Sequence, residues 1–252
     1  MSGIIYIGVD DTDVMGSPGT GKITRGLAQH LADSGLAVSL GVSRHQLLVD
    51  PLVKYTSHNS SKGIALRTDK SVLAFYQPCI SYLESCFQPG ADPGLCVCDE
   101  EQVTEDVIIF GQRAETTVLS KEEALEMAAK NNIFLRELGG DGGGVIGALA
   151  AVGLRASGND GRLVDVKGVR DIKGLVSVAE IKQRTSIQSV QDTQGRVVSD
   201  DELIDSLGWI RPSLVGGRAV LRVKLTQKAG RQIWLPAEKR LKQEHKEDKQ
   251  DD

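Results

Sequence analysis

Three carboxylates follow a short apolar run near the start of the chain. Residues 4–9 are mostly apolar, which predicts a buried strand. Asp10, Asp11 and Asp13 come where that strand should end. Packing does not account for them, because like charges repel and the end of a buried strand gives them little water. Since Mg²⁺ takes carboxylate oxygens and brings substrate phosphates with it, we predict that these three residues bind metal and act in catalysis. A turn or helix cap is the alternative.

A glycine-rich loop at residues 16–22 follows the acids and leads into an amphipathic run. Such a loop exposes backbone N–H groups, and the next helix points the positive end of its dipole at an anion. The spacing nearly matches a P-loop, but Ile23 stands where that motif needs a hydroxyl for Mg²⁺. We predict a phosphate loop of a different type, and a plain glycine-rich turn is the alternative. The residues assigned to cofactor binding here are Gly19, Thr20, Gly21, Lys22 and Thr24.

A second glycine cluster, residues 139–144, precedes an apolar run that predicts a helix. Five of its six residues are glycine, which is costly in chain entropy, so we favour backbone approach to a ligand. Gly142, Gly143 and Gly144 are therefore assigned to cofactor binding. If both loops bind one triphosphate, they must converge at one edge of the sheet. The alternative is that the glycines only allow tight packing of the helix on the sheet.

A polar segment at residues 55–61 predicts a surface loop. We expect His58 and Asn59 to face the acceptor, with His58 as a catalytic residue and Asn59 at the cofactor. Arg44 and His45 are expected nearby. Any single histidine is more often a hydrogen-bonded structural residue than a catalyst.

The composition sets limits on the class of protein. A chain of 252 residues, 40% hydrophobic and 25% charged, has room for one large globular domain or two small ones. A net charge of −4 and 4% aromatic residues argue against a general nucleic-acid binder, which would be basic. No apolar stretch predicts a membrane span, and the N-terminus lacks the features of a signal peptide, so a cytoplasmic protein is expected. The cysteines lack zinc-ligand spacing and are interpreted as reduced thiols.

Several elements can be predicted between the motifs. Ser120 and Glu123 form a capping box that should open a helix through Lys130. A helix is expected over residues 98–113 and a short strand over 116–119. Beyond residue 165 the chain becomes β-rich, with a short helix expected after Ser199. The charged residues 238–252 predict a solvated helix or a disordered tail.

Two motifs together resemble the archaeal agmatidine synthetase of isoleucine tRNA, a tRNA 2-agmatinylcytidine synthetase. They are Val-Asp-Asp-Thr-Asp at residues 9–13 and the Gly-Val-Ile-Gly-Ala-Leu-Ala-Ala-Val-Gly run at 144–153. The resemblance implies an ATP- and Mg²⁺-binding, kinase-like α/β domain over residues 1–164. It also implies a small ferredoxin-like α+β domain over 165–237. The OB-fold and zinc-ribbon domains of that family have no counterpart here, so a short stand-alone homologue is expected.

The resemblance implies phosphoryl transfer from ATP to an acceptor oxygen, followed in that family by attack of an amine. We expect the phosphate chemistry to transfer better than the substrate, with an unidentified and perhaps small-molecule acceptor. Binding of tRNA is not expected to be tight. The alternative function is a non-catalytic, ATP-binding sensor or regulatory module. The carboxylates favour the enzyme, because nucleotide binding alone does not need three acids, whereas phosphoryl transfer gains from bound metal.

Overall fold

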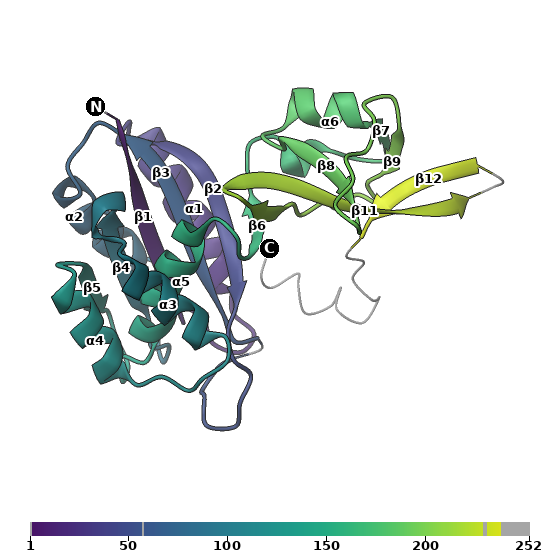
Figure 1. Cartoon of the computed structure of the whole chain (residues 1–252). Coiled ribbons are helices and arrows are strands. Elements are labelled where there is room, and N and C mark those ends of the chain that lie inside the picture. The colour runs from purple at the N-terminus through teal and green to yellow at the C-terminus, as the bar shows by residue number, and fades with distance from the viewer. Residues whose placement is uncertain (1, 57, 229–230, 238–252) are drawn as a thin grey trace.

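The computed structural model describes residues 2–56, 58–228 and 231–237, which form two lobes (Figure 1). Helices and strands are mixed, and one continuous sheet passes through both lobes. The fold is therefore a sheet-dominated mixture of helices and strands. Within the described ranges, every helix is too short or too polar for a bilayer crossing.

The sheet of the first lobe has the strand order β5-β4-β1-β3-β2, and each neighbouring pair is antiparallel. Its centre is apolar, because Ile5, Ile7 and Val9 of the first strand are all buried. The strands are β1 (Gly3–Asp10), β2 (Val38–Gln46), β3 (Ser60–Thr68), β4 (Gly94–Asp99) and β5 (Phe134–Glu137).

The register of this sheet brings the acid run and the second glycine cluster to the same edge. Gly94 of β4 pairs with Asp10 at the end of β1 and also with Glu137 at the end of β5. Because β1 and β5 are both antiparallel to the strand between them, they run in the same direction and end at the same edge. The acid run follows β1 there, and the second glycine cluster follows β5.

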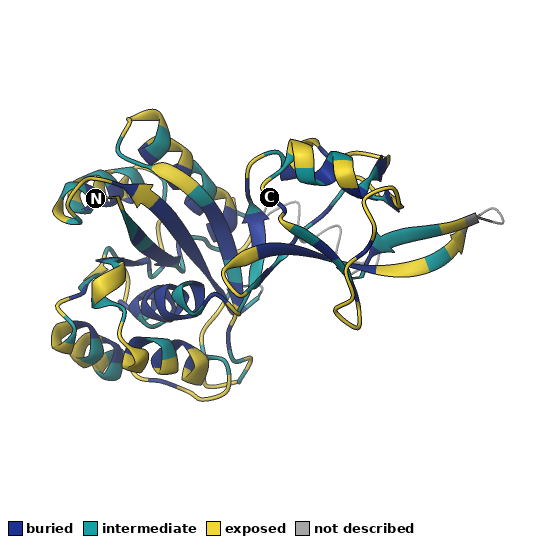
Figure 2. Cartoon of the chain, turned by 45° about the horizontal axis from the view of Figure 1, so that its top comes forward, coloured by how far each residue is buried: buried dark blue, intermediate teal, exposed yellow. Residues whose placement is uncertain are grey.

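Helices cover both faces of this sheet. Ile23 and Leu27 of α1 pack with Phe75 of α2 against one face, and Phe110 of α3 packs with Leu149 of α5 against the other. Figure 2 shows that one helix of the first lobe is almost wholly buried, and the buried residues identify it as α5. The helices are α1 (Thr20–Asp33), α2 (Leu73–Glu84), α3 (Glu105–Ala114), α4 (Lys121–Lys130) and α5 (Gly144–Ser157).

Small residues allow α5 to lie unusually close to the sheet, as the sequence predicted. A Cβ atom on Gly8 of β1 would lie 1.8 Å from the carbonyl oxygen of Ala148. A Cβ atom on Gly94 would lie 2.2 Å from the carbonyl carbon of Gly144. The start of α5 is thereby fixed directly above the end of β1.

The second lobe begins at β6, which pairs with β2 of the first lobe and with β10. It has its own core, which contains Ile181, Val190 and Leu221. The described part of this lobe has one α-helix, so it differs from the two-helix ferredoxin-like order that the resemblance implied. Its elements are β6 (Arg162–Asp165), β7 (Leu175–Ser177), α6 (Val178–Arg184), β8 (Ser189–Asp192), β9 (Leu203–Asp205), β10 (Ser213–Val215), β11 (Arg218–Lys228) and β12 (Arg231–Pro236), with 3₁₀ turns η1 (Glu100–Gln102) in the first lobe and η2 (Val169–Asp171) in the second.

Some local predictions are confirmed and others are wrong. The capping box at Ser120 is present and α4 follows it. The helix expected over 98–113 is wrong in its first part, because Cys98 is buried in β4 and the helix begins at Glu105. No strand forms over 116–119, and no helix follows Ser199. The expected tail, 238–252, lies outside the described residues. Free thiols are found at Cys79, Cys86, Cys96 and Cys98.

Candidate functional site

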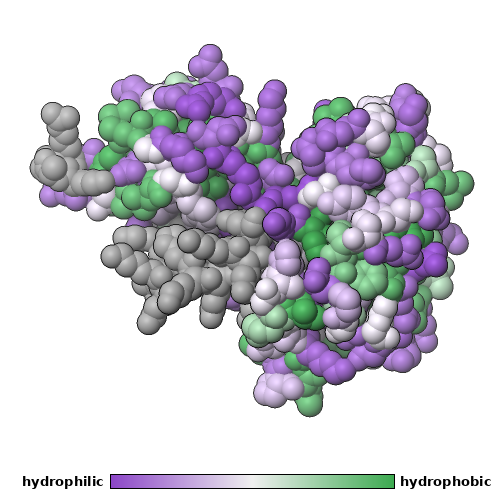
Figure 3. Space-filling model, turned by 180° about the vertical axis from the view of Figure 1, so that it is seen from behind, coloured by the Kyte–Doolittle hydropathy of each residue, from purple (hydrophilic) through white to green (hydrophobic). Residues whose placement is uncertain are grey.

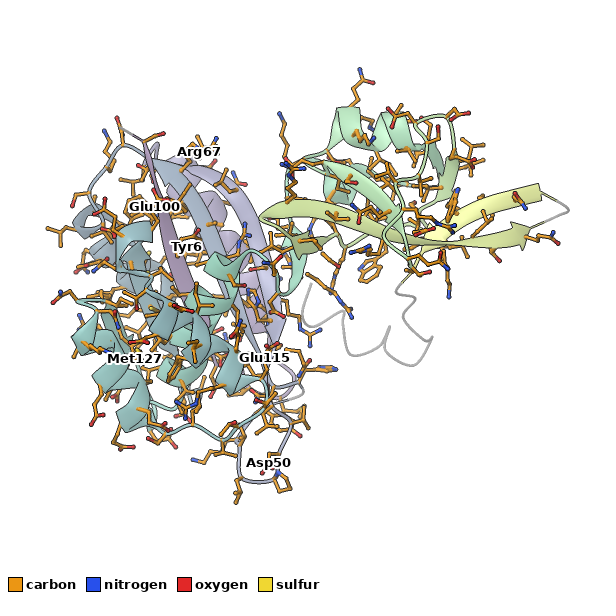
Figure 4. All side chains as sticks on the ribbon, in the orientation of Figure 1. Tyr6, Asp50, Arg67, Glu100, Glu115 and Met127 are labelled. Atoms are coloured by element: carbon orange, nitrogen blue, oxygen red, sulfur yellow. The ribbon has the colours of Figure 1, made fainter. Side chains whose placement is uncertain are left out.

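A cavity of about 280 Å³ opens at the sheet edge where β1 and β5 end. The acid run, the start of α1, the loop between β2 and β3, and the start of α5 all line it. The loop between β2 and β3 carries Asp50 and projects beyond the end of the sheet (Figure 4). The charged residues that line the cavity are Asp10, Asp11, Asp13, Lys54, Lys62, Asp92 and Asp141, with His58 beside them.

Asp10 is held at the base of this cavity against the first turn of α5. A Cβ atom on Gly147 would lie 1.7 Å from the Asp10 Oδ2 atom, so only glycine leaves room for this carboxyl group. Burial raises the pKa of Asp10 to about 8, although the nearby Lys62 acts in the opposite direction. The neighbouring charge of Asp11 raises it further. A cation bound here would therefore stabilise the ionised form.

Asp11 has a left-handed backbone conformation with φ of 52°, which aspartate tolerates better than most residues. Burial raises its pKa to about 6, and the charges of Asp92, Asp13 and Asp141 act in the same direction. A non-glycine residue at positive φ in a crowded acidic cavity is the kind of local strain that is found at functional sites.

Asp13 is tied to the start of α1. It accepts a hydrogen bond of 2.6 Å from the Thr20 hydroxyl and one of 3.3 Å from the Thr56 hydroxyl. Thr20 in turn accepts hydrogen bonds from the backbone N–H and the hydroxyl of Thr12, at 3.3 and 3.1 Å. The threonines therefore fix the path of the acid run past the helix.

The three predicted metal ligands line one cavity, but they are not a complete metal site. Among the described residues, no group of three His, Cys, Asp or Glu side chains is gathered so that it could hold a metal ion. The donor set nevertheless fits a hard cation that is shared with phosphate oxygens, because Mg²⁺ in such sites takes one or two protein carboxylates. Burial and the neighbouring carboxylates raise the pKa values of Asp10 and Asp11, so a bound cation would offset the cost of ionising them.

Two lysines of this cavity were missed by the sequence analysis. Lys62 of β3 is buried, with 2% of its surface exposed, and its ammonium group donates hydrogen bonds of 3.1 and 3.2 Å to the carbonyl and hydroxyl oxygens of Ser60. Lys54 forms an exposed ion pair of 2.5 Å with Asp141 across the mouth of the cavity. A lysine inside an otherwise strand-like run, at residues 60–68, was the available signal for Lys62.

The second glycine cluster has two kinds of glycine. Gly140 and Gly142 have positive φ values of 63° and 79°, and a Cβ atom on either would clash with a carboxylate. Gly143 and Gly144 have no such φ value, and they line the cavity. Asp141, between Gly140 and Gly142, accepts a hydrogen bond of 3.0 Å from the Gly143 N–H. The cluster therefore combines a required turn with backbone that faces the cavity.

The structure does not bring every predicted cofactor residue to the cavity. Lys22 is exposed and faces a second cavity on another side of α1. The Thr24 hydroxyl is buried and donates a hydrogen bond of 2.8 Å to the carbonyl of Thr20 within the helix. Of the remaining predicted residues, Thr20, Asn59, Gly143 and Gly144 line the acid-containing cavity, whereas Gly19, Gly21 and Gly142 do not.

His58 and Asn59 both line the cavity, as the acceptor hypothesis requires. Asn59 is largely buried, and its side-chain amide donates a hydrogen bond of 2.5 Å to the carbonyl of Leu48, which makes it a structural brace for this loop. The expectation of a surface loop through residue 61 is wrong at its end, because Ser60 and Ser61 are buried in β3. An apolar wall faces the acids, formed by Leu47, Leu48, Leu52, Val53, Ala114, Val118, Leu119 and Ile146.

His45 lies outside the cavity in a buried hydrogen-bonded cluster. Its Nδ1 atom is 2.6 Å from Asp160 and its Nε2 atom is 2.7 Å from the Ser43 hydroxyl. Burial lowers the pKa of His45, so the neutral ring is favoured. Glu115, at the end of α3 (Figure 4), is hydrogen-bonded to Asp160. Since Ser43 and His45 are fully buried, we interpret this cluster as structural.

We predict that Glu115→Gln stabilises the protein more at pH 8 than at pH 5. Burial and the adjacent Asp160 raise the pKa of Glu115 from 4.5 to about 7. A carboxyl group whose pKa is higher in the folded than in the unfolded state stabilises the folded state fully below pH 4.5. This stabilisation is lost as the pH rises to 7. Glutamine keeps the neutral donor at every pH, so its advantage should grow across that range, to about 1 kcal/mol after allowance for solvent. Urea unfolding at both pH values measures this. The same difference at both values would contradict it, and the effect should shrink in an Asp160→Asn background.

Comparison with known proteins shows a likeness in fold. No protein-family model matches the chain, and neither does any curated protein. The structure of TiaS bound to an isoleucine tRNA and ATP is 24% identical over 65% of this chain, with a TM-score of 0.52. TiaS bound to the same tRNA, AMPCPP and agmatine is 22% identical over 65%, with a TM-score of 0.52. Apo TiaS, an agmatidine synthetase of that tRNA, is 23% identical over 65%, with a TM-score of 0.51.

The matched region spans 37% of the TiaS chain in the ATP complex, so this protein corresponds to well under half of that enzyme. At this level of identity the comparison shows a TiaS-like fold and nothing finer.

Proposed function

We propose that the protein binds ATP with Mg²⁺ in the cavity at the sheet edge and transfers a phosphoryl group to an acceptor oxygen. One observation carries the proposal: the acid run, Thr20 at the start of α1, the second glycine cluster and a buried lysine converge on one cavity although they lie far apart in the sequence. Phosphoryl transfer requires mostly positioning and neutralisation of charge, and these groups supply both.

Each group has a separate role in this proposal. Asp10, Asp11 and Asp13 hold Mg²⁺, and the bound ion would neutralise developing negative charge on the phosphates. Gly143 and Gly144 leave room for a phosphate to approach the backbone closely, and their N–H groups donate to the Asp141 carboxylate and the Asp92 carbonyl, which fixes the shape of the loop. Lys62 places a buried positive charge at the cavity floor, where the low local dielectric strengthens its effect on an anion.

The lining residues also indicate which side of the cavity would take the acceptor. His58 and the apolar wall lie on the side of the loop between β2 and β3, which leaves that side for the acceptor. Five aspartates against two lysines give the cavity an excess of negative charge. That excess suits an amine as a second substrate once the phosphates have left. The agmatine and AMPCPP named in the TiaS complex support an ATP-dependent ligation of this kind.

The proposal assigns the chemistry to a kinase-like domain, residues 1–164. The remaining residues, 165–237, form a small second domain. This division is supported by the separate apolar core of the second lobe, whose buried members other than Leu163 all follow residue 165.

An assay of ATP turnover tests the proposal. Purified protein is incubated with ATP and Mg²⁺, and a parallel sample contains EDTA in place of Mg²⁺. Each sample is run with and without agmatine as a test amine. We expect slow Mg²⁺-dependent formation of ADP, which is the leaving group when one phosphoryl group is transferred from ATP. A non-catalytic ATP sensor is the second candidate, and the lack of a ready-made group of three metal ligands among the described residues favours it. ATP binding without turnover under every condition would support the sensor, and no ATP binding would reject both.

Gly143→Val is predicted to weaken ATP binding by about tenfold, because the added side chain would block the close approach of a phosphate to the loop backbone. A Cβ atom at this position would lie 3.2 Å from Asp141 and otherwise meets no close neighbour. The fold should therefore tolerate it with a modest loss of melting temperature. Calorimetric titration with a non-hydrolysable ATP analogue measures the affinity. Unchanged affinity with a large loss of stability would show that the glycine serves packing alone.

A further inference from the structure

A second cavity, of about 560 Å³, lies on another side of α1, away from the acid run. It is formed by α1, the end of α2 and the segment that follows β6, so both lobes contribute to it. Its lining residues are Pro18, Lys22, Ile23, Arg25, Gly26, Gln29, Tyr82, Cys86, Asp165 and Arg170.

One face of α1 lines this cavity. Lys22, Arg25 and Gln29 follow each other at helical spacing, so they share a face, and all three line the cavity. The opposite face carries Leu27 and Leu31 into the core. The helix therefore presents two cations and an amide to one place, whereas its buried side holds it against the sheet.

The position of Lys22 is unfavourable for the helix itself. It lies in the first turn of α1, where the helix dipole disfavours positive charge, and that turn contains no acidic residue. The N-cap residue, Gly19, makes no side-chain cap. A bound anion would offset both features, because it would pair with the lysine beside the positive end of the dipole.

The second lobe completes the positive lining. Arg170 of η2 is exposed, and its guanidinium donates a hydrogen bond of 3.2 Å to the carbonyl of Val164, which orients it. Among the described residues that line the cavity, Asp165 is the one carboxylate beside three cations. Figure 3 shows hydrophilic side chains gathered where the two lobes meet.

The floor of this cavity is aromatic and closely packed. A Cβ atom on Gly26 would lie 2.0 Å from the Tyr82 hydroxyl oxygen, so glycine is needed for the tyrosine to reach under α1. The Tyr82 ring also lies against His30, with ring centroids 5.3 Å apart. The floor thus offers a ring and a hydroxyl below the three cations.

We propose that this cavity binds a phosphate-bearing ligand of nucleotide size, with Lys22, Arg25 and Arg170 on the phosphate and Tyr82 below the remainder. The volume is within the range of small-molecule sites, and paired guanidinium groups suit phosphate oxygens. The phosphate belongs either to a free nucleotide or to the backbone of an RNA. This site is separate from the ATP cavity, so it does not depend on the proposed function.

Lysine footprinting tests the site directly. The whole chain is treated with an acetylating reagent alone, with AMP, and with a single-stranded RNA 20-mer, in EDTA so that the proposed Mg²⁺-dependent site is suppressed. Modification of Lys22 is then measured by mass spectrometry against the exposed Lys70 as an internal control. We expect selective protection of Lys22. Protection by AMP identifies a free nucleotide, and protection by RNA alone identifies a polynucleotide.

A charge variant gives the second measurement. Arg170→Ala should weaken binding of the protecting probe by about tenfold, as loss of a charge-assisted phosphate contact does. Arg67→Ala, at the exposed far end of β3 (Figure 4), is the matched control and should leave the affinity unchanged. Equal effects of the two variants would show general charge attraction and overturn the site. Absence of Lys22 protection by either probe at millimolar concentration would also overturn it.

Discussion

Asp11→Asn is expected to lower Mg²⁺-dependent ATP turnover by on the order of 100-fold or more, since it removes charge that acts on the transferring phosphoryl group. The carboxyl group lines the cavity, and burial together with crowding by Asp92, Asp13 and Asp141 raises its pKa to about 6. Asparagine removes this repulsion at nearly constant volume. The protein should therefore remain folded, with a melting temperature equal to or slightly above that of the wild type.

Asp69→Asn provides the matched control for this substitution. Asp69 is exposed at the end of β3, and its change should alter neither turnover nor melting temperature. If Asp11→Asn kept full turnover, the assignment of metal binding to the acid run would be wrong. If it lost turnover together with the folded structure, as seen by circular dichroism, the role of Asp11 would be structural.

Eight of the predicted site residues line one cavity, whereas several of the predicted helices and strands around them are wrong. The acid run and the second glycine cluster are both unusual in the sequence. The first costs charge repulsion and the second costs chain entropy, and packing alone offsets neither cost. Their convergence could not be derived from either motif alone. It depends on β4 lying between β1 and β5, which is set by the pairing of Gly94 with Asp10 and Glu137.

The errors have physical causes. Lys22 was assigned to the phosphate loop from its spacing, but the start of α1 rotates it toward the second cavity. A lysine inside a buried, strand-like run is a signal for Lys62, but the run alone does not show that its side chain reaches a cavity. Cys98 was placed in a helix because a short, continuous buried strand has no periodicity that distinguishes it from a buried helix.

The second large effect is expected from Gly147→Ala. The new Cβ atom would lie 1.7 Å from Oδ2 and 2.5 Å from Cγ of Asp10, so the carboxyl group must leave its position. Because the clash is with a side chain, the backbone of α5 should keep its place, and alanine favours the helix by about 1 kcal/mol over glycine. We therefore expect a nearly unchanged melting temperature and a loss of ATP turnover on the order of 100-fold, similar to the loss of an active-site electrostatic contact.

Two further variants decide whether that loss acts through Asp10. Gly111→Ala, where α3 meets α5, places a Cβ atom 2.9 Å from the carbonyl of Ala150 and should lower stability without changing the ATP affinity of the folded fraction. In an Asp10→Ala background the clash partner is gone, so Gly147→Ala should cost little further turnover. The effects of substitutions at two residues in contact do not add. A double-mutant cycle should therefore return a coupling energy close to the full effect of Gly147→Ala alone. Additive losses would mean that Gly147 serves the packing of α5. The role of Asp10 would then be judged from the turnover of Asp10→Ala alone.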